Sequence, residues 1–389
     1  MAPELVATYR QWSKHISRVL LLLLLSVHFI SNANAEEIQP GASDAKAKLP
    51  EPLTLVYLLE LDVKDHPALQ RASAAIELQN ANKELALSDY EFTANLLLEA
   101  RAIEPNAIAY DQDQNDSQAH LYLSKRLYDF GKTSAAEDAA VADIEGSELL
   151  YVNSYNQHRI AIMSRFFSVL LADITYDRDN EAMSIGYVRY DRGRQRNKLG
   201  QVSDVELLKL ENRFQLLRRA YFKSQAEQRN SRSRLANAVN RPGELVTDLV
   251  EPKLHVPLGD TPDVAELQKN AMANNPVVKA LRLKLAAAED RVKEARSGRN
   301  PTIDGRVRVS EYARQSGSYD EWRVGIVLDV PILASDSVKA NVSKRNAELL
   351  DMRARLREVE MEVSQQVLEA WQMLQSLKVA REQTDVQND

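Results

Sequence analysis

The sequence contains no cysteine, only 12 glycines and 13 prolines, and 6% aromatic residues in 389 positions. The absence of cysteine excludes disulfides, iron–sulfur clusters and thiolate metal sites. Few residues that interrupt helices, together with abundant Ala, Leu, Glu, Lys, Arg and Gln, favour long helices. The formal net charge of −6 lacks the basic excess typical of proteins that bind nucleic acid. The composition therefore predicts a mainly helical protein, long enough for two or three domains, with no nucleic-acid partner.

Long apolar runs are also lacking, except for Val19–Ile30 near the N-terminus. Three basic residues precede this run, and an Ala-x-Ala sequence follows it and ends at Ala35. This order is typical of a secretory signal peptide, which we assign to residues 1–35, with a membrane anchor as the alternative. Polar residues 36–52 are expected to form a flexible lead-in. No later run is long enough for a transmembrane helix, so the exported chain is periplasmic or secreted, or meets a membrane through strands.

Motifs for catalysis and metal binding are missing as well. The six histidines are scattered, with no His-x-x-x-His pair. The tripeptide at Gly131–Thr133 resembles the end of a phosphate-binding loop, but Arg126 stands where such a loop has its first glycine. We predict no enzyme activity, no cofactor and no metal site.

An internal repeat organises the rest of the chain. The sequence Asp62–Gln70 matches Ala271–Lys279, so that Pro67, which is expected to end or kink a first short helix, falls on Pro276. In each copy a helical pattern leads into two alternating segments and then into a very long helical pattern. The first repeat is expected to span residues 53–240, with a helix over 53–89, strands over 91–103 and 117–130, and a long helical hairpin over 134–240. Residues 241–263 form a linker, and the second repeat spans 264–389, with a helix over 264–299, strands over 302–314 and 320–333, and a long helix over 336–385.

The alternating segments have one polar and one apolar face, because side chains on a strand point to opposite faces with a period of two. The polar set comprises Thr93, Asn95, Glu99, Asp304, Arg306 and Arg308. The apolar set comprises Ile303, Val307, Val309, Trp322, Val324, Ile326 and Leu328.

The long helical hairpin is expected to turn near residue 200. Gly200 suits the left-handed position that follows the end of a helix. Ser203 and Glu206 have the spacing of a capping box that opens the return helix. The predicted tip contains Lys198, Leu199, Gly200, Val202 and Ser203.

Four stretches, taken in order, resemble the TolC-like outer-membrane efflux protein family. Asn274–Ile303 resembles the family's helix that runs into the first strand of the second repeat, and Trp322–Leu333 resembles its second strand. Leu127–Ala140 resembles the strand-to-helix junction of the first repeat, and Lys198–Phe214 resembles the periplasmic hairpin tip. The resemblance covers residues 53–389.

This resemblance implies a homotrimer in which four strands per subunit close a 12-stranded barrel in the outer membrane, above a periplasmic helical tunnel. The polar set would line the pore, although a water-facing sheet of a periplasmic domain is the alternative, and the apolar set would face lipid. The tip residues would dock a periplasmic adaptor (membrane fusion) protein that connects the channel to an inner-membrane pump. The implied function is a passive exit duct of a tripartite efflux or type I secretion system.

One departure from the family pattern concerns the second repeat. By the repeat spacing, a second hairpin tip is expected beyond Asp389, so the sequence resembles a C-terminally truncated family member, with its gate residues outside the sequence. Two alternatives to the exit duct stay open. In the first, the chain is a periplasmic coiled-coil adaptor or structural protein. In the second, it is a non-functional remnant of an efflux channel.

Overall fold

The computed structural model describes residues 49–61, 64–244, 248–252, 262–314, 320–332 and 336–388. The chain divides into two units, Met1–Pro50 and Glu51–Asp389, and all helices and strands described below belong to the second. The predicted signal peptide, residues 1–35, lies outside the described residues, as does most of the predicted lead-in.

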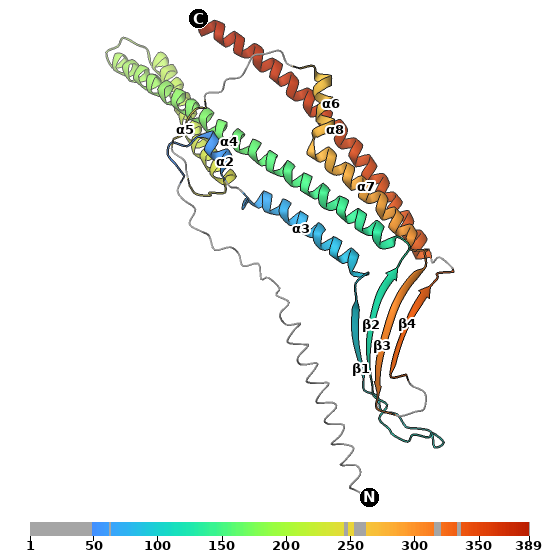
Figure 1. Ribbon diagram of the computed structural model, residues 1–389. Helices are drawn as coiled ribbons and strands as arrows, with labels where there is room; N and C mark the ends of the chain where they lie inside the picture. The colour runs from blue at the N-terminus through green and yellow to red at the C-terminus, as the bar shows by residue number, and fades with distance from the viewer. Residues whose placement is uncertain are drawn as a thin grey trace, which may run out of the picture. The chain divides into compact units, whose positions relative to one another are not determined.

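Helices dominate the second unit, and four strands interrupt them (Figure 1). In chain order the elements are α2 (Leu55–Glu60), α3 (Pro67–Ser88), β1 (Thr93–Glu99), β2 (Gln118–Tyr128), α4 (Lys132–Lys198), α5 (Asp204–Ala238), α6 (Val264–Asn274), α7 (Pro276–Ser297), β3 (Thr302–Tyr312), β4 (Trp322–Asp329) and α8 (Asp336–Asn388). The predicted mainly helical class with two β-hairpins is therefore confirmed.

The strands form one antiparallel sheet in the order β1-β2-β3-β4. Each hairpin comes from one repeat, and β2 joins them by pairing with β3, so that Leu123 lies opposite Val307. The β2–β3 register shifts between Arg126 and Tyr128, close to the helical end of the sheet. In the single chain, β1 and β4 are the two edges of the sheet.

The two repeats begin their sheet-forming halves in the same way. His66 and Asn275 each cap a helix of 22 residues, and a proline follows each cap at the first helical position. Proline is suited to this position because its missing N–H has no partner in the first turn of a helix. The match between Pro67 and Pro276 in the sequence therefore marks the N-termini of α3 and α7.

Helix α4, with 67 residues, is the element on which the other helices assemble. It packs against α3, α5 and α7, and α8 packs against α6 and α7. The side chains of Ile162, Phe166 and Val169 on α4 are almost completely buried. Leu235 on α5 and Val278 on α7 are equally buried. The apolar core thus lies along the middle of α4, away from the sheet.

Some boundaries differ from those expected. The predicted helix 264–299 is two helices, because Asn275 adopts an extended conformation and caps α7 while Pro276 cannot continue α6. The region 53–89 likewise contains two helices, separated before Pro67. The strands are shorter than their alternating patterns, since β1 covers only Thr93–Glu99 of the predicted 91–103. None of the helices in the described ranges is long and apolar enough to cross a membrane.

Candidate functional site

The four-stranded sheet has two chemically distinct faces. Its register places Leu96, Leu121, Val309 and Trp322 in one row across the strands, and Ala94, Leu123, Val307 and Val324 in the next. Residues directly opposite on paired strands share a face. All seven residues of the apolar set lie on this face. The side chains of Trp322 and Ile326 are 69% and 74% exposed, so no part of the described chain covers the face.

The opposite face carries the complete polar set. One row contains Thr93, Ser124, Arg306 and Gly325, and the next contains Asn95, Tyr122, Arg308 and Arg323. Two apolar residues also lie on this face, Leu97 in the row of His120 and Ser310, and Val327 opposite Asp304. Polar contacts join neighbouring strands, such as the 2.6 Å contact between the hydroxyls of Thr93 and Ser124 and the 2.9 Å contact between His120 Nδ1 and Ser310 Oγ.

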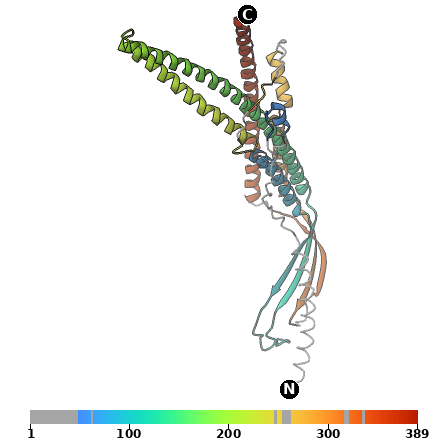
Figure 2. The same ribbon diagram turned by 90° about the vertical axis from the view of Figure 1, so that its left-hand side faces the viewer.

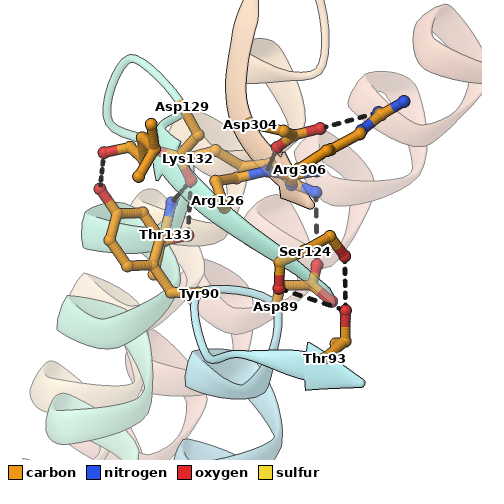
Figure 3. Close-up of polar contacts among 11 residues, drawn as sticks. Asp89, Tyr90, Thr93, Ser124, Arg126, Asp129, Lys132, Thr133, Asp304 and Arg306 are labelled. Atoms are coloured by element: carbon orange, nitrogen blue, oxygen red, sulfur yellow. Dashed lines mark hydrogen bonds and ion pairs between the residues drawn. The ribbon is translucent and has the colours of Figure 1, made fainter. Parts of the chain in front are cut away.

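Asp304 is the centre of a charged cluster on this face (Figure 3). Its Oδ1 accepts a hydrogen bond from Arg126 Nε at 3.1 Å, and its Oδ2 accepts one from Arg306 Nη2 at 3.2 Å. Asp304 is 13% exposed, and this limited exposure keeps the pairs partly shielded from water and salt. One carboxylate thus holds two guanidinium groups, and the cluster keeps a net positive charge.

A hollow of about 830 Å³ opens over this part of the polar face. Its lining comes from the end of α3 and from all four strands. The lining residues are Ser88, Asp89, Glu91, Thr93, Tyr122, Leu123, Ser124, Lys125, Arg126, Asp304, Arg306, Val307, Arg308, Arg323, Gly325 and Val327. The hollow therefore brings together charges from both repeats.

The turn from β2 into α4 depends on a buried carboxylate. Asp129 accepts hydrogen bonds from the backbone N–H of Gly131 at 3.2 Å and of Thr133 at 2.8 Å, and from the Thr133 hydroxyl (Figure 3). Phe130 and Gly131 both have positive φ, 54° and 89°. Glycine adopts this conformation without strain, whereas phenylalanine rarely does. Asp129 and its partners thus fix the direction in which the longest helix leaves the sheet.

The predicted hairpin tip residues lie together between α4 and α5, at the end of the hairpin seen in Figure 2. Gly200 has φ of 69°, and its N–H donates to the Asn197 carbonyl at 2.9 Å. Ser203 Oγ accepts from the Glu206 N–H at 3.3 Å and so caps α5. The Leu199 side chain is 71% exposed. The turn is well capped, and it presents an apolar side chain to solvent.

A pair of histidine rings lies among the helices. The ring centroids of His66 and His158 are 4.1 Å apart. Burial lowers the pKa of His158, and the neighbouring His66 ring lowers it further. Within the described residues, no group of three or more His, Asp or Glu side chains is arranged to hold a metal ion.

The sequence-based prediction omitted several residues of the polar face. Tyr122, Ser124 and Arg126 follow the period of two along β2, and Arg323 does so along β4, so this signal was present in the sequence. The cap provided by Asp129 had a weaker signal, since an acid two residues before a glycine is common.

Four antiparallel strands with uncovered apolar side chains, set between helices far longer than those of globular domains, define a subunit of a membrane channel with a helical extension. The model of the family described as "Outer membrane efflux protein" matches residues 267–388. Over these residues the chain matches a family of outer-membrane efflux proteins, in agreement with the TolC-like resemblance of its sequence.

Individual relatives agree with the family. Protein CyaE of Bordetella pertussis is 22% identical over 348 residues, which cover 85% of this chain and 71% of CyaE. The outer membrane protein VceC of Vibrio cholerae has a similar structure, with a TM-score of 0.69, 14% identity, and coverage of 85% of this chain and 81% of VceC. The CmeC outer membrane channel of Campylobacter jejuni gives a TM-score of 0.66 at 14% identity, with coverage of 85% and 76%. At such low identities the structural matches establish the fold alone.

Proposed function

We propose that three copies of this chain close a 12-stranded barrel in the outer membrane, which serves as the exit duct of a tripartite efflux or type I secretion system. The sheet has four antiparallel strands, so β4 of one copy would run antiparallel to β1 of the next. Three such joints complete the barrel, since three times four strands is twelve. Closure also satisfies the backbone groups at both edges, which a bilayer leaves without partners.

The two faces of the sheet support the orientation of this barrel. Uncovered apolar side chains such as Trp322 and Ile326 suit the hydrocarbon of a bilayer, where no water competes. The arginines and hydroxyls of the other face suit a water-filled lumen. We therefore assign the apolar set to lipid and the polar set to the pore.

The helices also support self-association. Ile160, Phe167, Leu171 and Ile174 on α4 follow spacings of seven, four and three residues and are all exposed, Leu171 and Ile174 by 67% and 65%. Such spacings form an apolar stripe along a helix. The stripe would pack against helices of a neighbouring copy in a tunnel wall.

The partners we propose are a periplasmic adaptor protein and an inner-membrane pump. The capped tip around Gly200, with its exposed Leu199, supports the docking of an adaptor. The pump would supply the energy, and cargo would diffuse through the duct without covalent chemistry. Export of the chain would use residues 1–35 as a signal peptide.

The two-faced sheet is the observation that carries this proposal, and adjacent residues of β4 test it. Ile326 lies on the apolar face, whereas Val327 lines the hollow on the polar face. Arginine on the lipid face of a barrel costs roughly 2–4 kcal/mol near the bilayer midplane, whereas lumenal substitutions are tolerated. We expect Ile326→Arg to lower the yield of heat-modifiable trimer in outer-membrane fractions strongly, and Val327→Arg to leave it near the wild-type yield.

Both variants introduce the same charge into the same strand, so Val327→Arg controls for the effect of arginine itself. Equal yields of trimer from the two variants would contradict the assignment of the faces. A wild-type protein recovered as a periplasmic monomer would overturn the proposed function as a whole.

A further inference from the structure

Two arginines face each other across the β3–β4 hairpin. Arg308 lies directly opposite Arg323 on the polar face, in the row that Asn95 and Tyr122 complete. This row contains no acid. Like charges directly opposite on paired strands are destabilising. The arrangement therefore lacks an obvious structural purpose within the folded chain.

The charges around this pair do not balance. The imbalance is local to the strands: four arginines of the lining, Arg126, Arg306, Arg308 and Arg323, lie on the polar face with a single strand acid, Asp304. Lys125 also lines the hollow, but its register places it on the apolar face, where its Nζ lies over the Phe92 ring. The other acids near the hollow, Asp89, Glu91 and Asp320, come from the segments before β1 and β4.

Arg308 makes no salt bridge among the described residues, and Asp320 attracts it only at longer range. Asp304 is shared by Arg126 and Arg306, and Arg323 pairs with Asp320 in the loop before β4. Arg308 Nε is buried and has no hydrogen-bond partner among the described residues. A buried donor without a partner costs free energy that a bound acceptor would recover.

We propose that this hollow binds the anionic group, a carboxylate or a phosphate, of soluble molecules in transit, with Arg308 and Arg323 as its main ligands. Guanidinium groups present a planar fork of donors that matches both anions. The inference rests on the proposed function, because it takes the polar face as the lumen. Three copies would then repeat the site as a ring of arginines, an arrangement that favours anions in pores. The channel would thus be suited to anionic cargo.

Acids also lie at the end of the sheet that carries the β1–β2 and β3–β4 loops, but they do not neutralise the arginines of the hollow. Glu99 lies in the row of Gln118 and Tyr312, two rows beyond the arginine pair. Asp111 and Asp116 already pair with arginines of the loops, Arg314 and Arg101. The excess of arginines over acids on the strands is therefore confined to the middle of the sheet and the part nearest the helices, and Asp320 offsets part of it at Arg323.

Pyrophosphate is a suitable probe because it is a small, soluble, multivalent anion. Its binding to the purified full chain in detergent would be measured by calorimetry. We expect Arg308→Gln/Arg323→Gln to weaken binding at least tenfold. Arg178→Gln/Arg353→Gln, which removes the same charge from exposed arginines of α4 and α8, should bind like the wild type.

Thermal melting gives an independent readout. Pyrophosphate should raise the melting temperature of the wild type, because it binds only the folded hollow, and should not raise that of the Arg308→Gln/Arg323→Gln variant. If that variant does not fold, Arg308→Lys/Arg323→Lys keeps the charge and removes the planar fork, and weaker binding than wild type is again expected. Equal pyrophosphate affinity in the sheet variants and the wild type, or no binding to the wild type at millimolar concentration, would overturn the proposal.

Conductance of the wild type in planar bilayers separates this inference from the proposed function. A conducting protein that does not bind pyrophosphate would refute the anion site alone. A protein that binds pyrophosphate through the two arginines but never conducts would refute the channel and leave the binding site standing.

Discussion

Replacing Gly193 with valine would disturb the packing of the α4–α5 hairpin. Gly186 and Gly193 are buried on α4 and lie seven residues apart, and Leu217 and Leu210 on α5 have the same spacing. A Cβ atom on Gly186 would approach Leu217 Cδ1 to 2.6 Å, and one on Gly193 would clash with Leu210 Cδ1. Each leucine thus fills a space that exists because the facing residue has no side chain, and the heptad spacing repeats this contact.

The size of the effect follows from two opposing contributions. Valine is less unfavourable than glycine in a helix, by roughly 0.3 kcal/mol. Extra atoms forced into a packed interface typically cost about 1–3 kcal/mol. The clash is with the end of the partly exposed Leu210 side chain, which can relieve part of it by moving, although leucine has few rotamers in a helix. We therefore expect Gly193→Val to lower the opening free energy of the hairpin by about 1–3 kcal/mol.

Amide hydrogen exchange measures this opening locally. Since each 1.4 kcal/mol is a factor of ten, exchange in the tip half of α4 and α5 should accelerate by roughly 5- to 150-fold. Arg189→Val, on the exposed side of the same helix, should change exchange only about twofold. Adding Leu210→Ala to Gly193→Val should restore much of the protection. Exchange in Gly193→Val no faster than in Arg189→Val would refute the close packing of the hairpin.

Other predictions concern the junction, the histidine pair and the tip. Asp129→Ala should cost about 1–2 kcal/mol, since the N–H groups that Asp129 accepts from lose their partner, and thermal melting should show this while the exposed Asp89→Ala stays unchanged. His158 is held neutral by its lowered pKa, whereas the unfolded ring takes a proton near pH 6.5, so stability should fall as pH decreases through this value. His158→Gln should remove that part of the decline between pH 7.5 and 5, as measured by melting; an identical pH profile would contradict it. Ser203→Ala should speed tip exchange through a loss of about 0.5–2 kcal/mol, whereas Ser203→Asp, which can also cap, should not.

The faces of the strands could be predicted from the sequence because side-chain direction on a strand is a local property. The alternation of Val307 and Val309 with Arg306 and Arg308 fixes the face without knowledge of the partner strand. The hairpin tip could also be predicted from the sequence, since Gly200 and Ser203 form their turn and cap with residues close to them in the chain. Both kinds of prediction require only short-range geometry.

Contacts between the repeats could not be predicted in this way. Arg126 and Asp304 are 178 residues apart, and their pairing requires the β2–β3 register, which no turn sets. The opposed pair of Arg308 and Arg323 was also hidden, because the loop between β3 and β4 leaves their register open. The positive φ of Phe130 has no sequence signal, since it is imposed by the turn that Asp129 stabilises.

Three features of the described chain lack a partner within it: the apolar face of the sheet, the two sheet edges and the exposed apolar stripe on α4. Together they restrict the possible assemblies. An uncovered apolar sheet face alone could be met by a partner protein, and two free strand edges alone could be blocked by loops or charges. The exposed stripe on α4 alone could pair with any coiled-coil partner. A second copy placed edge to edge can pair one edge of each sheet and cover the stripe, but it leaves the two outer edges free and cannot cover the apolar face, which is left for lipid. Of these arrangements, the proposed closure of the sheet within a bilayer meets all three needs, and it would turn the polar face with its opposed arginines inward, toward a lumen.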